Sequence, residues 1–166
     1  LKLVNNVATG TRVEITSLKQ AAAYLGEDKL KQFVTILALS KLATDKTSEV
    51  SKQSLITAKL MAALAKESAF IEISDFAFIT GLLSAIEVIL SMPMDEILQT
   101  MPLAEPIKDA LVNHSGLLGQ LLELTTNYIT GHGENIQQLT ELYGLDGNFI
   151  HKEFVNASNW CKSLDI

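Results

Sequence analysis

The chain has 166 residues, 48% of them apolar, and its 19 acidic residues outnumber 13 basic ones to give a formal net charge of -6. This length and apolar content suit one compact domain. The acidic balance argues against a nucleic-acid partner, because phosphate recognition needs clustered Lys and Arg, and Arg12 is the single arginine.

A lone cysteine, Cys161, has no second thiol for a disulfide or a structural zinc site, so we expect a reducing, cytoplasmic setting. The longest apolar run, residues 77–90, falls short of the roughly 20 residues that cross a bilayer. It therefore predicts a buried core helix and no membrane association. Because the chain starts at Leu1 without a methionine, we expect a piece of a longer protein.

Apolar residues recur at intervals of three and four, which predicts an all-α fold. In chain order, a capping box formed by Ser17 and Gln20 opens a helix that Gly26 should end. The polar segment 44–53 predicts a loop, and a helix should follow as far as Ser68.

The next predicted helix carries the sequence "GLLSAIE" at residues 81–87. Ser74 and Asp75 should start it, and it should end near Ser91 because Pro93 disfavours helix just before it. Five of its apolar residues should belong to the core: Leu82, Leu83, Ile86, Ile89 and Leu90.

Short helices are predicted over 93–101 and 105–113, each with proline near its first turn. Gly116 and Gly131 flank a further helix, and a last amphipathic helix should begin at about Asn148. Unequal lengths and the absence of a repeat predict an irregular multi-helix bundle.

Sequence-local catalytic motifs are absent. His114, His132 and His151 lie 18 and 19 residues apart, so no two occupy the three- or four-residue spacing of paired ligands on a helix. Asp95 and Glu96 are adjacent and point in different directions, which fits a solvated first turn. We predict no catalytic residue, no metal ligand and no cofactor.

Glu87 is a carboxylate within a strongly apolar run, three residues after Ser84. An unpaired carboxylate is costly to bury. Two readings stay open, a partly exposed position at the helix edge and a buried position with a partner.

The opening residues resemble the start of a known domain family. "LKLVNNVATG" followed by "EITSLKQAAAYLGEDKLKQFV" resembles the start of the HDOD domain, the HD-related output domain of bacterial signalling proteins. Asn6 replaces the usual serine. The positions that match the family pattern are Asn5, Thr16, Ser17, Gln20, Ala21, Leu25, Gly26 and Leu30. Residues 77–124 are similar to the branch of the family found behind an EAL domain in cyclic di-GMP signalling proteins.

The resemblance allows "GLLSAIE" to be compared with the metal-binding helix of related enzymes. Active HD phosphohydrolases carry "GLLHDIG"-like helices whose histidine and aspartate bind metal, and Ser84 and Ala85 stand at those two positions. Thr57 falls about where an earlier helix offers the first ligand histidine. None of the three supplies the imidazole or carboxylate ligands that activate water on a metal, so the resemblance implies a degenerate metal site.

The resemblance further implies a single HD-superfamily-like HDOD domain over 1–166, truncated in its first helix, with an EAL domain upstream. The expected function is a non-enzymatic regulatory module. Its partner would be the EAL domain, another signalling protein or a second copy, with Asn5, Asn6 and Glu87 as candidate structural or interaction residues. Two alternatives stay open: a phosphohydrolase with a metal site rebuilt from the three histidines and scattered carboxylates, and a sensor that binds a small ligand where the metal stood.

Overall fold

The computed structural model describes residues 45–99, 101, 103–132 and 136–164. Within these ranges every regular element is a helix, which confirms the predicted all-α irregular bundle. Asn5, Asn6, Arg12, the capping box at Ser17 and the stop at Gly26 lie outside the described residues. The elements are α4 (Asp45–Leu64), η1 (Ser68–Ile73), α5 (Ser74–Leu83), α6 (Ile86–Leu90), α7 (Met94–Gln99), α8 (Glu105–Asn113), α9 (Gly116–Thr130), α10 (Ile136–Tyr143) and α11 (Gly147–Ser163).

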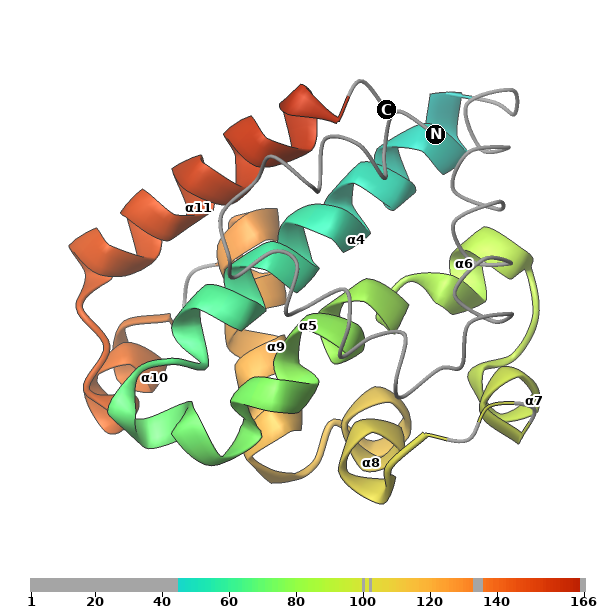
Figure 1. Ribbon diagram of the computed structural model, residues 1–166, viewed down its shortest axis with the longest axis horizontal. Coiled ribbons are helices and arrows are strands. Elements are labelled where there is room, and N and C mark those ends of the chain that lie inside the picture. Colours follow the sequence, from blue (N-terminus) through green and yellow to red (C-terminus); the bar gives the residue numbers. More distant parts are fainter. Residues whose placement is uncertain (1–44, 100, 102, 133–135, 165–166) are drawn as a thin grey trace.

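The long helix α4 is the centre of the described bundle. It packs against α5 on one side and α11 on another, and α9 crosses behind it (Figure 1). Its buried apolar side chains are Leu55, Ala58, Leu60, Met61 and Leu64. Helices from the middle and the end of the described chain therefore meet on this one helix.

The predicted loop at 44–53 is wrong, because Asp45–Gln53 forms the first half of α4. Ser51 and Ser54 are both 1% exposed, and the Ser54 hydroxyl donates a 2.6 Å hydrogen bond to the carbonyl oxygen of Leu82 in α5. Tertiary packing of this small polar face makes the segment helical, although its residues have only a weak intrinsic preference for helix. At its other end α4 stops at Leu64, before the predicted Ser68.

The apolar helix α5 begins at Ser74, as predicted, and residues 77–83 are buried. A β-carbon added at Gly81 would lie 2.6 Å from the α-carbon of Ala58. The glycine therefore lets the backbones of α4 and α5 touch. Of the five residues predicted for the core, Leu82, Leu83 and Ile86 are buried, whereas Ile89 and Leu90 are half-buried against it.

The apolar run does not form one continuous helix, which corrects the sequence prediction. It breaks at Ser84 and Ala85, and α6 resumes at Ile86. The Ser84 hydroxyl donates a 2.8 Å hydrogen bond to the Gly81 carbonyl, and that carbonyl also accepts from the Ser84 amide at 3.4 Å. This three-residue closure tightens the last turn and ends α5.

By length and composition alone, the segment Phe70–Leu90 is apolar enough to cross a membrane, since it adds seven residues to the run noted in the sequence. In the structure this segment is divided among η1, α5 and α6. Residues 77–83 are buried within the bundle. The prediction of a core position is confirmed for residues 77–83 and for Ile86, whereas Glu87 and Val88 are exposed.

The later helix ends follow the local signals. The Pro93 carbonyl accepts hydrogen bonds from the Glu96 and Ile97 amides as α7 begins, and Pro106 is the second residue of α8. Gly131 ends α9 with φ 74°. At the start of α11, the Asp146 side chain accepts from the Asn148 amide, one residue from the predicted start. The sequence reading did not identify α10, residues 136–143.

Helix α11 lies along α4 (Figure 1). Cys161 is buried at this contact, with its sulfur 3.8 Å from the Lys52 carbonyl oxygen. Lys59 reaches over the ring of Trp160, 5.1 Å from its centroid. Burial raises the pKa of the Cys161 thiol, so the cysteine packs as a small apolar side chain.

Candidate functional site

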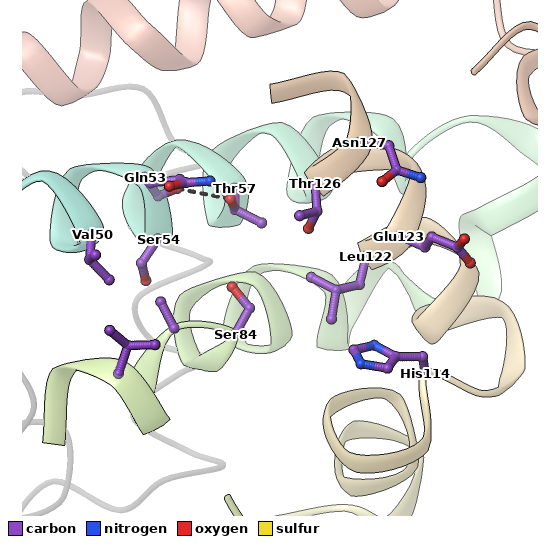
Figure 2. A pocket seen from close by; sticks show the side chains of 12 residues that line it. Val50, Gln53, Ser54, Thr57, Ser84, His114, Leu122, Glu123, Thr126 and Asn127 are labelled. Atoms are coloured by element: carbon purple, nitrogen blue, oxygen red, sulfur yellow. Dashed lines mark hydrogen bonds between the residues drawn. The ribbon is translucent and has the colours of Figure 1, made fainter. Parts of the chain in front are cut away.

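A pocket of about 560 Å³ opens between α4, the α5–α6 junction, the end of α8 and α9. Figure 2 shows side chains from all these elements directed around one space. The described residues that line it are Val50, Gln53, Ser54, Thr57, Ser84, Ala85, Val88, His114, Leu122, Glu123, Thr126 and Asn127.

The three degenerate metal positions named from the sequence all line this pocket. Thr57 comes from α4, and Ser84 and Ala85 form the junction between α5 and α6. Figure 2 shows Thr57 and Ser84 on opposite sides of the same space. Two segments separated by more than 20 residues in sequence therefore meet where the resemblance places metal ligands.

Glu87 is not among the residues that line the pocket. It lies in the first turn of α6 and is exposed to solvent. Of the two readings left open from the sequence, the structure supports the exposed edge position. Its neighbour Val88 does line the pocket.

Three hydroxyl groups of the pocket, those of Ser54, Thr57 and Ser84, donate to backbone carbonyls. Thr57 donates a 2.8 Å hydrogen bond to the Gln53 carbonyl, and Ser54 and Ser84 donate to the carbonyls of Leu82 and Gly81. Since α5 ends at Leu83, these last two carbonyls lie in its final turn, where the regular four-residue helical bonds end. The Ser54 and Ser84 hydroxyls thus provide hydrogen-bond donors for carbonyl groups at the end of α5.

His114 is the one described histidine that lines the pocket. It ends α8 in the left-handed conformation, with φ 50°, and the Ser115 amide donates to the Asp109 carbonyl at 3.3 Å. A β-carbon on Gly119 would collide with the His114 carbonyl group. A close approach of α9 to the end of α8 therefore fixes the backbone position of His114.

The other two histidines lie elsewhere. The His151 ring is 3.1 Å from the Tyr128 hydroxyl, and the His132 ring is 2.9 Å from the Thr130 hydroxyl. Both are exposed. In the described ranges, no three His, Cys, Asp or Glu side chains gather closely enough to hold a metal ion, so the three histidines do not assemble the rebuilt site considered above.

Sequence reasoning missed the contribution of α9. Glu123, Thr126 and Asn127 line the pocket from this helix. Their spacing of three and four residues places polar side chains on one helix face within the otherwise apolar "LLELTTNYI". That interruption of the apolar pattern was the available signal.

The family model of the HDOD domain matches residues 1–131. The chain belongs to the HDOD domain family. In this HDOD domain the match reaches the end of α9, so it includes every described wall of the pocket. Helices α10 and α11 lie beyond it.

Two curated relatives align with almost the whole HDOD domain. One is the cyclic di-GMP phosphodiesterase CdgJ of Vibrio cholerae, 28% identical over 165 residues, which cover 99% of this chain and 38% of the relative. The other is the uncharacterized protein YuxH of Bacillus subtilis, 29% identical over 172 residues, which cover 99% of this chain and 40% of the relative. The chain thus spans about two fifths of each relative. No solved structure matches it.

Restoring the two ligand types at the helix break should not restore chemistry. We expect the double variant Ser84→His and Ala85→Asp to show no metal-dependent hydrolysis of bis-p-nitrophenyl phosphate above that of the unmodified chain. Thr57 still lacks an imidazole, and its hydroxyl hydrogen is bonded to the Gln53 carbonyl, whereas water activation needs a complete ligand set. Assays with added Mn²⁺ test this, with Ser84→Ala as the control. Manganese-stimulated turnover in the double variant alone would contradict the prediction.

Proposed function

We propose that this HDOD domain is a non-enzymatic regulatory module of a bacterial, cytoplasmic cyclic di-GMP signalling protein. The observation that carries the proposal is the chemistry of the pocket at the degenerate metal position. Thr57, Ser84 and Ala85 converge there, and neither hydroxyl nor methyl groups hold a divalent cation that activates water. The relative named as a cyclic di-GMP phosphodiesterase supports the signalling context.

The proposed partner is an EAL domain N-terminal to this chain. Each curated relative is more than twice as long as the segment that aligns here, which leaves room in such a protein for a separate catalytic domain. In this arrangement the EAL domain hydrolyses cyclic di-GMP, and the HDOD domain changes its rate through contact. Another signalling protein or a second copy of the chain are the competing partners.

The test is the cyclic di-GMP hydrolysis rate of the full-length protein with and without residues 1–166. We expect removal to change the rate by about fivefold or more, the range of a coupling free energy of 1 kcal/mol and above. Adding the 166-residue chain back in trans controls for damage to the remaining protein. Sedimentation of the same samples reports oligomeric state. An unchanged rate together with an unchanged oligomeric state would contradict the regulatory role.

A second candidate function is a sensor in which a small ligand sets the regulatory state. The specific observation that favours it is the pocket itself, because a volume of about 560 Å³ lies within the range of small-molecule sites. Its walls come from four places in the chain. A ligand that joined them would change how these helices pack.

A further inference from the structure

The break between α5 and α6 rests on a small change of backbone conformation. Of the two residues between these helices, Ser84 keeps right-handed helical angles, with φ −59° and ψ −25°. Ala85 departs from them, with φ −109° and ψ 8°, and the chain is helical again from Ile86. Rotation about the backbone of one residue therefore separates the broken form from a continuous helix.

The local sequence at this point favours the continuous helix. Alanine is the best helix former among the amino acids, and positions 84–85 hold neither glycine nor proline. The buried side chains on either side of the break have the spacing of one helix face: Ile79, Leu82, Leu83 and Ile86. Burial of this face in the core does not itself require the break.

A contact from α4 opposes this local preference. In a continuous helix the Leu82 carbonyl would accept a hydrogen bond from the Ile86 amide, four residues further on. Here it accepts from the hydroxyl of Ser54 in α4 at 2.6 Å, and the Gly81 carbonyl accepts from the Ser84 hydroxyl at 2.8 Å. Side chains that enter the hydrogen-bond ladder in this way kink a helix.

We propose that the α5–α6 junction is a two-state hinge and that the Ser54 hydroxyl holds it in the broken form. Local helix preference and one tertiary hydrogen bond are of comparable size, and regulatory transitions use elements balanced in this way. Ser54 and Val88 line the same pocket from α4 and α6, so a shift of α4 at Ser54 changes the direction of α6. This inference names the element that moves in the regulatory module and rests on that function only in treating the movement as a signal.

The variant Ser54→Ala removes the donor that α4 supplies. The carbonyl of the buried Leu82 then needs another partner, and a continuous helix offers the Ile86 amide. We therefore expect helical backbone carbon-13 shifts at Ala85. Hydrogen exchange at the Ile86 amide should become about tenfold slower, the scale of one net hydrogen bond. Both signals are measured by NMR on the 166-residue chain.

The matched control is Thr57→Val. Thr57 lies one turn further along α4 and is 3% exposed, and its hydroxyl donates to the Gln53 carbonyl of its own helix. The substitution therefore removes a buried hydroxyl from the same pocket wall without removing a hydrogen bond to α5. The signals of Ala85 and Ile86 should stay as in the unmodified chain.

Two further variants separate the hinge from a general loss of structure. Ser84→Ala removes the hydroxyl that bonds to the Gly81 carbonyl from a half-buried position. It should shift both signals in the same direction, even if Ser54→Ala does not fold. Adding Ala85→Gly to Ser54→Ala should return the exchange rate of the Ile86 amide toward that of the unmodified chain, because glycine is the poorer helix former.

Four results would overturn the hinge: unchanged signals in a folded Ser54→Ala, unchanged signals in Ser84→Ala, an equal shift in Thr57→Val, or no reversal by Ala85→Gly. Unchanged signals would mean that core packing alone fixes the break. These measurements record backbone structure and not hydrolysis. A failure here therefore leaves the regulatory proposal standing, and an unchanged phosphodiesterase rate leaves the hinge standing.

Discussion

Replacement of Gly81 by alanine is expected to destabilise the domain by about 3 kcal/mol or more, at the upper end of the cost of overpacking a core. The new methyl group would lie 2.6 Å from the Ala58 α-carbon, 2.8 Å from its amide nitrogen and 2.9 Å from the Thr57 carbonyl carbon. All three are backbone atoms, so neither helix can yield by rotating a side chain. Alanine favours helix over glycine by about 1 kcal/mol, which is too little to offset this clash.

Urea unfolding followed by circular dichroism measures this effect. Gly147→Ala is the matched control, because a β-carbon there meets no atom within 4 Å and the residue opens α11. We expect that variant to be unchanged or slightly more stable. Equal stability of Gly81→Ala and the unmodified chain would show that α4 and α5 do not cross at this point.

Truncation of Leu83 to alanine should cost about 2 to 5 kcal/mol of unfolding free energy. Its side chain is 0% exposed and belongs to the main core cluster. Removing it leaves a cavity next to the α5–α6 break, where the chain is held by the Ser84 hydrogen bonds and cannot easily close over the gap.

Val88→Ala serves as the comparison for Leu83→Ala. Val88 is 62% exposed, so its loss should change the unfolding free energy by less than about 0.5 kcal/mol. A cost below 1 kcal/mol for Leu83→Ala in the same urea titration would place this residue outside the core and contradict the structure.

The helix ends that sequence could predict are those fixed by one residue's own backbone preference. Proline at position 106 and glycine at position 131 act on the chain next to them, whatever else the fold contains. The start of α11 within a residue of Asn148 belongs to the same group, because the Asp146 side chain caps it. Residues next to each of these helix ends determine it, so the boundary can be predicted from the sequence alone. Helix α5, by contrast, begins at the predicted Ser74 but has no side-chain cap.

The errors fall where distant contacts decide. Nothing in "TDKTSEVSKQ" shows that Ser51 and Ser54 will be buried against another helix, yet that packing makes the segment helical. The break at Ser84 has no glycine or proline of its own to announce it. It depends on one hydroxyl bonding to the Gly81 carbonyl and on another, from Ser54, reaching the Leu82 carbonyl.

Some residues of the candidate site could likewise be predicted from the sequence, and others could not. Family resemblance singled out Thr57, Ser84 and Ala85, and the structure brings all three to one pocket. The side chains from α9 carry no motif, and only the crossing of α9 behind α4 places Glu123 and Asn127 at the pocket (Figure 2). The family resemblance located the pocket, and the packing of α9 showed which further polar side chains line it.

The contact between α4 and α11 also bears on how the domain is made. A ribosome releases α4 more than 80 residues before it finishes α11, which at 5–20 residues per second takes on the order of ten seconds. During that interval the face of α4 that later meets α11 at Cys161 has no cover from α11. Until α11 emerges, this face of α4 is open to aggregation and to chaperone binding, even after all the described walls of the pocket have been made.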